Sequence, residues 1–241
     1  MYRHLDSEKI VVALDLLSRR VRERFPQAGL TKVVEELYKT GQEAQERSLW
    51  VARPLWHFRI LIGALLVLIV ASFVPIAGTL KLINHPLTLG EFIQVLESGI
   101  NDVIFLGIGI FFLVTLETRI KRRRILSLLH ELRALAHVID MHQLTKDPES
   151  LLRTHQKTKS SPQRTMTEFE LQRYLNYCSE MLAMISKIAA LYVQHFPDTE
   201  IVDVVNDIES LTHGLSRNIW QKIMLLQSLS KGLAGSGSRT F

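Results

Sequence analysis

Hydrophobic residues along this chain occur either as unbroken runs or as regular stripes. The longest run covers residues 60–80, which hold 21 consecutive residues without a charged side chain. A helix rises about 1.5 Å per residue, so this length crosses the roughly 30 Å hydrocarbon core of a bilayer. Pro75 lies near the end of the run, where a membrane helix tolerates it with a slight kink. The run therefore predicts a first membrane span.

A second apolar run is shorter and more ambiguous. Residues 103–116 hold 14 uncharged residues, or about 21 Å of helix, which also fits a re-entrant or buried core segment. Residues 98–102 lengthen the run if Asp102 lies at the far interface, while Glu117 and Arg119 can extend their charges to the near one. We predict two spans, at about 60–80 and 99–118, joined by an outer loop at 81–98.

Basic residues are distributed unevenly around these two spans. Residues 1–59 hold 11 Lys and Arg, whereas residues 81–102 hold a single lysine and three acidic residues. Five more basic residues directly follow the second span: Arg119, Lys121, Arg122, Arg123 and Arg124. Because cytoplasmic segments of membrane proteins are enriched in Lys and Arg, this pattern predicts that both termini are cytoplasmic.

Outside the two runs, apolar residues recur at the spacing of amphipathic helices. One stripe lies in residues 7–25 and consists of Ile10, Leu14, Leu17 and Val21. Pro26 and Gly29 interrupt it, and a more polar helix is predicted from about Thr31 to Glu46. Together, residues 1–58 are predicted to be cytoplasmic N-terminal helices.

The segment after the second span also predicts a helix. Its apolar positions alternate at intervals of three and four residues, as in a short coiled coil or a bundle helix: Ile125, Leu128, Leu132, Leu135 and Ile139. Apart from Gly107 and Gly109, no helix breaker lies between Phe105 and Gln143. We therefore expect the second span to continue into the cytoplasm as one long helix, with residues 119–147 as its extension.

The C-terminal part predicts a helical hairpin at 166–231. A polar linker at 148–165 precedes it, and Thr165 with Glu168 and Thr167 with Glu170 both match the capping box of a helix N-terminus. A wide stripe follows, made of Leu171, Tyr174, Cys178, Met181, Ile185, Ile188 and Tyr192 with Leu175, Leu182 and Ala189 beside it. Phe196, Pro197 and Asp198 predict a sharp corner before the last helix, whose stripe is Ile201, Val204, Ile208, Leu211, Leu215, Ile219, Ile223 and Leu226. Residues 232–241 are expected to be a disordered tail.

Together these patterns predict an all-α protein with a two-span membrane hairpin and a cytoplasmic helical bundle or coiled coil. The composition agrees with a mixed architecture, because 47% of the residues are apolar while 22% are charged. Such a chain is too polar for a multi-span transporter and too apolar in places for a wholly soluble domain. The single cysteine, Cys178, excludes an intramolecular disulfide framework and a Cys-based zinc site.

Three stretches of the sequence resemble a family of uncharacterised bacterial two-span membrane proteins. They are HVIDMHQLTKDPE at 137–149, SSPQRTMTEFELQRYLNYCSEM at 160–181 and LSRNIWQKIM at 215–224. The resemblance covers most of the chain from the first span onward. It implies a location in the bacterial inner membrane, and it brings no known activity, cofactor or catalytic residue.

Candidate catalytic and metal-binding residues are few. His130 and His137 lie on one helix face with Asp140, but the two histidines are about 10.5 Å apart along the axis, too far to share one ion. His142 lies roughly 140° around the helix from His137. Cys178 lies within an apolar stripe and has no basic helical neighbour to activate it, so we expect a packed core residue. We therefore expect no metal, no cofactor and no enzymatic activity.

The flanks of the second span carry the remaining candidate sites. The basic residues 119 and 121–124 predict contact with anionic lipid headgroups rather than with nucleic acid, because they directly follow a span. Gly107 and Gly109 predict close packing of helices. Asn101 and Asp102, with Glu97 nearby, fit either the acidic outer mouth of a pore or a helix N-terminus capped by Asp102. An amphipathic pattern in the outer loop is made of Leu89, Phe92, Ile93 and Leu96.

Two functional hypotheses follow. The first is a homo-oligomeric, non-enzymatic membrane scaffold or regulator that contacts a protein partner through its cytoplasmic helices. The second is a homo-oligomeric ion channel or pore lined by the second span. A membrane-bound enzyme has less support, because the sequence contains no recognisable nucleophile and base, metal or nucleotide motif.

Overall fold

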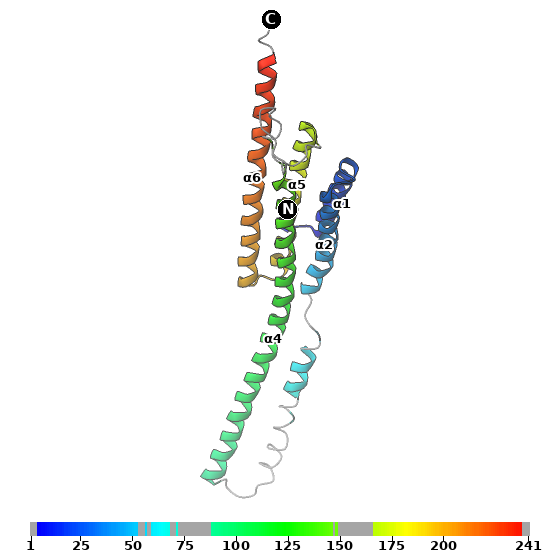
Figure 1. Cartoon of the computed structure of the whole chain (residues 1–241). Helices are drawn as coiled ribbons and strands as arrows, with labels where there is room; N and C mark the ends of the chain where they lie inside the picture. The colour runs from blue at the N-terminus through cyan, green and yellow to red at the C-terminus, as the bar shows by residue number, and fades with distance from the viewer. Residues whose placement is uncertain are drawn as a thin grey trace. The chain divides into compact units, whose positions relative to one another are not determined.

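The computed structural model describes residues 4–52, 56, 59–67, 71, 88–146, 148 and 166–237. Within these ranges the regular structure is helical and no strand occurs, which confirms the all-α fold class. The helices are α1 (Ser7–Arg24), α2 (Gly29–Ala52), α4 (Leu89–Leu144), α5 (Glu168–His195) and α6 (Thr199–Gly237), and residues 59–67 are helical as well (Figure 1).

The chain divides into two compact units. One, the bundle unit, contains Met1–Ala52 and Ile125–Phe241, and the other, the apolar unit, contains Arg53–Arg124. The helix α4 belongs to both, because it passes from the apolar unit into the bundle unit at residue 125 without a break. This continuity agrees with the single long helix that the sequence predicts across residues 105–143.

The side chain of Asp6, the residue before Ser7, caps the first turn of helix α1. Its Oδ1 accepts hydrogen bonds from the amides of Glu8 at 3.1 Å and Lys9 at 3.3 Å. These bonds satisfy amide groups that have no partner within the helix. The bond from the Lys9 amide is also the main reason why the pKa of Asp6 is lowered. The predicted stripe of α1 is confirmed, because its four members are buried: Ile10, Leu14, Leu17 and Val21.

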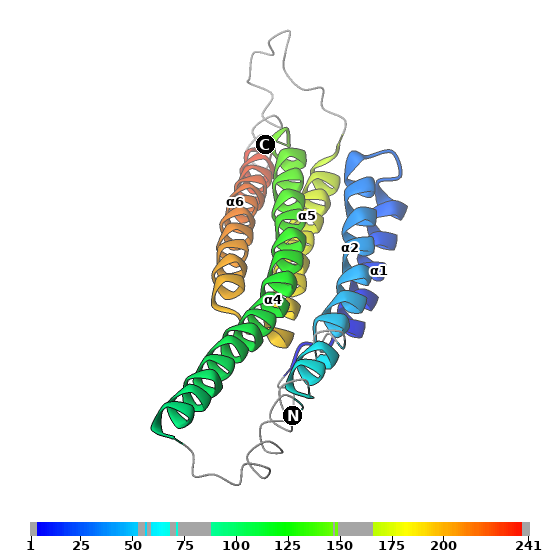
Figure 2. The same cartoon turned by 90° about the horizontal axis from the view of Figure 1, so that it is seen from below.

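Helix α2 is longer than the sequence predicts. It begins at Gly29 rather than Thr31 and ends at Ala52 rather than Glu46. Leu30 and Ser48 are both fully buried, so tertiary packing stabilises turns whose own composition is only weakly helical. Figure 2 shows α1 and α2 side by side. Their close approach depends on Gly41, because a Cβ at this position would collide with Cδ1 of Leu14.

Helices α5 and α6 form the predicted hairpin. Thr167 is the N-cap of α5 and makes the complete capping box with Glu170, whereas the alternative box at Thr165 lies outside the described residues. Residues 196–198 form the corner between the two helices, as predicted. The predicted disordered tail is wrong at its start, because α6 continues to Gly237; residues 238–241 lie outside the described part.

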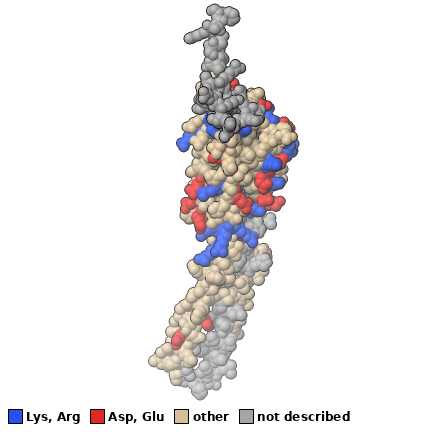
Figure 3. All heavy atoms as spheres, viewed as in Figure 1, with Lys and Arg blue, Asp and Glu red and all other residues tan. Residues whose placement is uncertain are grey.

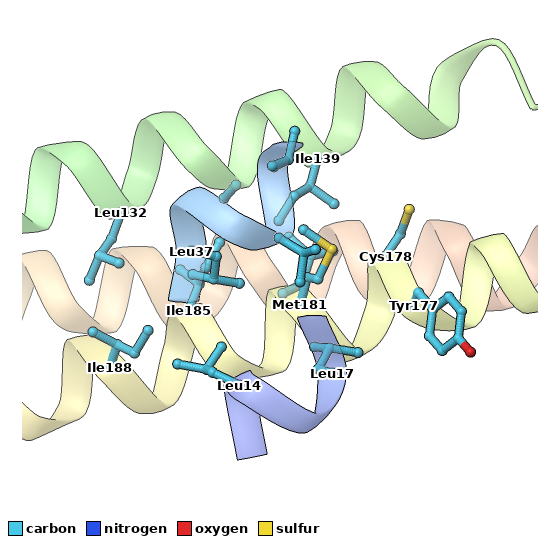
Figure 4. Packing of buried hydrophobic residues seen from close by; sticks show 14 of the residues in the cluster. Leu14, Leu17, Leu37, Leu132, Ile139, Tyr177, Cys178, Met181, Ile185 and Ile188 are labelled. Carbon is cyan, nitrogen blue, oxygen red and sulfur yellow. The ribbon is translucent and has the colours of Figure 1, made fainter. Parts of the chain in front are cut away.

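The core of the bundle unit receives side chains from all five labelled helices. Figure 4 shows some of them at close range, with α1, α2, α4 and α5 contributing in turn: Leu14 and Leu17, Leu37, Leu132 and Ile139, and Tyr177, Cys178, Met181, Ile185 and Ile188. Residues of α6, such as Ile208 and Ile219, belong to the same cluster. Burial of each large apolar side chain contributes about 1.5–3 kcal/mol relative to leaving it exposed.

The predicted stripe of α4 is correct at three positions and displaced at two. Ile125, Leu132 and Ile139 are buried, but Leu129 and Ala136 are buried in place of the predicted Leu128 and Leu135. Leu128 and Leu135 are half-buried at the edge of the core. Helix α4 therefore presents the wide face of a bundle helix rather than the narrow seam of a two-stranded coiled coil.

The N-terminal and C-terminal segments of the bundle unit pack against each other. Gln194 of α5 exchanges two hydrogen bonds with the backbone of Leu5, receiving one from its amide at 2.7 Å and donating one to its carbonyl at 3.3 Å. Arg20 of α1 forms an ion pair of 2.7 Å with Glu180 of α5. Residues 4–52, 125–146 and 166–229 thus share one core, because each segment has an apolar face that needs the others to cover it.

Only the edges of the predicted linker at 148–165 can be assessed. Pro148 is buried, and residues 149–165 lie outside the described residues.

The turn between α1 and α2 is closed by a side chain of α2. The hydroxyl group of Thr31 donates a hydrogen bond of 2.6 Å to the carbonyl of Phe25. This turn lies beside the end of α4 and the start of α5, which line one cavity with it.

Candidate functional site

The apolar part of α4 is the strongest candidate for a functional surface. In the described part of the chain, α4 is the one helix long and apolar enough to cross a membrane; its most apolar stretch has a mean hydropathy of 2.1, and none of that stretch is buried. Phe105 and Phe111 are each 74% exposed. Soluble monomers rarely expose such a continuous apolar surface. Length and exposure are therefore consistent with a span, although a soluble protein can contain one such helix as well.

The first predicted span is described only in part. Residues 59–67 are helical, and Ile60, Leu61, Leu66 and Val67 are all exposed. Residues 68–70 and 72–80 lie outside the described residues, so the full length of this span remains a prediction. Trp56, just before it, is exposed.

The predicted outer loop at 81–98 is partly wrong. Helix α4 begins at Leu89, so residues 89–98 belong to the same helix as the second apolar run rather than to a separate amphipathic helix. Leu89, Phe92, Ile93 and Leu96 are exposed along it. Residues 81–87 lie outside the described part of the chain.

The structure excludes one interpretation of Asp102. This residue lies 13 positions after the first residue of α4, about 20 Å along the axis, so it cannot cap the helix N-terminus. Asn101, Asp102 and Glu97 are all exposed. Glu97 and Asn101 are four residues apart and lie on one helix face, whereas Asp102 points about 100° away from Asn101. The three predicted pore residues therefore lie on two different faces of α4, Glu97 and Asn101 on one and Asp102 on the other.

The two glycines of α4 differ in their surroundings. A Cβ added to Gly109 would lie 3.5 Å from Cδ2 of Leu65, which is ordinary contact with the helix at 59–67. A Cβ added to Gly107 would meet no described atom within 4 Å. Of the predicted helix-packing pair, Gly109 therefore faces the neighbouring helix.

The basic residues after the apolar stretch do not form one uniform group. Lys121 is buried, and its ammonium group lies 3.0 Å from the Glu117 carboxylate, so its predicted contact with lipid headgroups is wrong. An unpaired lysine at this level of burial would be costly, which explains the partner one turn before it. Arg119, Arg123 and Arg124 are exposed and Arg122 is half-buried. Figure 3 shows Lys and Arg side chains gathered where the nearly uncharged surface ends.

The candidate metal and thiol residues are far apart or buried. His130 and His137 are exposed, Asp140 accepts a 2.6 Å hydrogen bond from Gln143, and His142 lies against Gly29. Among the described residues, no group of three or more His, Cys, Asp and Glu side chains is arranged to hold a metal ion. Cys178 is fully buried, as predicted, and burial raises the pKa of its thiol to about 12.

Two features of the bundle unit have no simple signal in the sequence. The first is a set of hydrogen bonds between α4 and α6. Lys222 of α6 donates hydrogen bonds to Gln143 of α4, and Gln143 in turn donates one to Asp140 of the same helix. The second is a cavity lined by the α1–α2 turn, the end of α4 and the start of α5. Both join residues that are more than 70 positions apart in the chain, so helical periodicity could not place them together.

Comparisons with known proteins do not add a family or a function. No family model, curated protein or solved structure matches this chain. The resemblance to bacterial two-span membrane proteins therefore stays a prediction from the sequence.

Proposed function

We propose that this protein is a non-enzymatic protein of the bacterial inner membrane that acts as a homo-oligomeric scaffold or regulator through its helical bundle. In this proposal the two apolar segments cross the membrane, and both termini lie in the cytoplasm. The resemblance of residues 137–149, 160–181 and 215–224 to bacterial two-span membrane proteins supports the location. The absence of a recognisable catalytic motif favours an assembly role.

One observation carries the proposal: α4 is a single helix that begins as an exposed apolar surface and ends as part of a packed core. Phe105 and Phe111 are highly exposed, whereas Leu132 and Ile139 of the same helix are fully buried. Because a continuous helix is stiff, a shift or rotation in the apolar segment would be transmitted to the core of the bundle. A partner bound to the bundle would in turn respond to events in the membrane.

The exposed arginines support the proposed orientation. Arg119, Arg123 and Arg124 follow the apolar stretch of α4, where they would reach anionic headgroups on the cytoplasmic side. Each such contact contributes about 1 kcal/mol near an anionic leaflet. Lys121 does not belong to this set, because Glu117 neutralises it.

Two measurements test the proposal directly. Reporter tags at residues 1, 86 and 241 should read cytoplasm, periplasm and cytoplasm in a bacterial host. The mass of the full-length protein in nanodiscs should exceed that of one 27.6 kDa chain by an integral factor. Periplasmic signal at either terminus would refute the topology, and a strict monomer would refute the homo-oligomer.

A channel is the second candidate, and the position of Asp102 favours it. Since Asp102 lies inside α4 and is exposed, a carboxylate would face lipid unless water or another subunit covers it. In a ring of subunits Asn101 and Asp102 would line the outer mouth of a pore. The test is cation conductance in proteoliposomes with Asp102→Asn, with Asp102→Glu as the matched control that keeps the charge at the same position. Conductance that Asp102→Asn leaves unchanged would refute the pore.

A further inference from the structure

A cavity of about 390 Å³ lies where three segments of the bundle unit meet. Its walls come from the turn at residues 25–29, the end of α4 at 142–146 and the start of α5 with Met166. This volume is sufficient for a small ligand, and pockets of this kind combine apolar walls with a few polar groups that fix orientation. The polar groups of this cavity share one property: most of them are hydrogen-bond donors.

The first donor is the hydroxyl group of Tyr174. This side chain lines the cavity and is only 2% exposed. Within the described ranges no residue accepts a hydrogen bond from its hydroxyl. Burial raises the pKa of Tyr174 above its ordinary value, so the phenol stays protonated. The hydroxyl group is therefore free to donate to an acceptor bound in the cavity.

The second donor is Lys146, whose ammonium group lies 5.4 Å from the centre of the Tyr174 ring. Lys146 lines the same cavity, and no acidic side chain in the described part of the chain forms an ion pair with it. A cation and a phenolic donor therefore face one small space together. Both would be satisfied by a single negatively charged acceptor.

The third set of donors is the start of α2. This helix begins at Gly29 in the cavity wall, and its first turn contains no acidic residue to offset the positive end of the helix dipole. Gly29 also leaves room for a histidine: an added Cβ would lie 2.6 Å from Cε1 of His142. The imidazole of His142 can donate into the same space.

One acidic side chain lies in the cavity wall. Glu170 lines the cavity, but one of its oxygens already accepts hydrogen bonds of 2.8 Å from the amide and the hydroxyl of Thr167. The carbonyl end of α4 also lies here, and the positive charge of Lys146 comes two residues after the last residue of the helix, Leu144. The remaining donors come from three different segments of the chain and therefore approach from several directions, which suits a tetrahedral oxyanion better than a planar carboxylate.

We propose that this cavity binds a phosphate group, held by the Lys146 ammonium group, the Tyr174 hydroxyl and the Gly29 amide at the start of α2. The phosphate can be free or belong to a small phosphate ester, including one with the chemistry of a lipid headgroup. This inference goes beyond the membrane role and does not depend on it, because every residue that it uses lies in the bundle unit.

The test is isothermal titration calorimetry of the full-length protein in phosphatidylcholine nanodiscs, in chloride buffer, with inorganic phosphate and with glycerol 3-phosphate as separate probes. We expect saturable binding of at least one probe at one site per chain. Binding of inorganic phosphate identifies a free anion site, and binding of glycerol 3-phosphate alone identifies a site for a headgroup-like ester. Failure of both probes would overturn the proposal.

Single-residue variants distinguish phosphate binding in this cavity from nonspecific attraction of phosphate to a positively charged protein. Lys146→Met should weaken binding at least tenfold, and Tyr174→Phe, which removes only one oxygen, should weaken it about fivefold. Lys32→Met is the matched control, because it removes the same charge from an exposed residue on α2 outside the cavity and should leave binding unchanged. Equal losses in Lys146→Met and Lys32→Met, or full binding by Tyr174→Phe, would also overturn the proposal.

Discussion

The ammonium group of Lys222 on α6 donates two hydrogen bonds to Gln143 on α4, one to the backbone carbonyl at 3.0 Å and one to the side-chain oxygen at 2.6 Å. Gln143 is only 2% exposed, and its amide nitrogen donates to Asp140 at 2.6 Å. The backbone carbonyl belongs to the last turn of α4 and also accepts a 3.0 Å hydrogen bond from the amide of Lys146, just beyond the helix. Lys222 therefore both caps α4 and links it to α6.

Replacing Lys222 with methionine should loosen this link. The substitution removes the partner of the side-chain oxygen of buried Gln143, whereas the Gln143 carbonyl keeps its hydrogen bond from the Lys146 amide. The free energy of unfolding should therefore fall by about 1–2 kcal/mol. Urea unfolding of the full-length protein in detergent, followed by circular dichroism, measures this change. Lys187→Met is the control, because its hydrogen bond goes to Ala183 of its own helix, and it should cost less. Equal effects of the two variants would show that the link does not stabilise the bundle.

The displaced stripe of α4 can be tested by truncating side chains. Leu132 is fully buried, so Leu132→Ala should lower the free energy of unfolding by about 2–5 kcal/mol through lost contacts and a cavity. Val138 lies on the outer face of the same helix at 37% exposure, and Val138→Ala should cost under about 1 kcal/mol. The same unfolding measurement applies. A large effect at Val138 would mean that another chain covers this face.

Helical periodicity was sufficient to predict the helices of the bundle unit and most of its buried residues. It was not sufficient to predict which faces of different helices pack together. The stripes of α1 and α5 were predicted residue by residue, because each helix has one apolar face and clear end signals, such as the Thr167 capping box. On α4 the choice between Leu128 and Leu129 depends on where the neighbouring helices lie, which a single helix does not encode.

The candidate sites show the same limit in a different form. Lys121 has the sequence context of a lipid contact, but Glu117 one turn earlier pairs with it once the side chain is buried. Asp102 matched a helix cap only as long as the helix was expected to begin beside it. The cavity at Tyr174 depends on three segments meeting, so no local pattern predicts it.

Stability should depend on pH through the two helix caps. Hydrogen bonds from the backbone lower the pKa of Asp6 and of Glu170 in the folded protein. Their contribution is therefore fully present above the ordinary carboxyl pKa and is lost as the pH falls through the lowered values. Melting temperatures between pH 6 and 3 should decline less steeply in Glu170→Gln than in the native protein. Parallel curves would show that the Glu170 cap contributes no pH dependence.

Cys178 should be inert in the folded protein. Burial raises the pKa of its thiol to about 12, and the nearby positive charges of Lys222 and Lys146 oppose that shift less strongly. At pH 8 the reactive thiolate is therefore almost absent, and the side chain is fully enclosed. Iodoacetamide should leave the native protein unmodified over hours and label it within minutes in 8 M urea, as measured by intact mass. Rapid labelling without urea would show that the bundle opens around α5.

The pairing of the two apolar helices can be tested at the glycines of α4. A side chain at Gly109 would contact Leu65, whereas one at Gly107 would contact no described residue. The double variant Leu65→Cys with Gly109→Cys should therefore form a disulfide under mild oxidation in membranes, and Leu65→Cys with Gly107→Cys should not. Mass spectrometry of proteolytic fragments distinguishes a bond within one chain from a bond between chains. Equal cross-linking of the two pairs would refute the packing at Gly109, and a bond only between chains would assign this contact to the homo-oligomer.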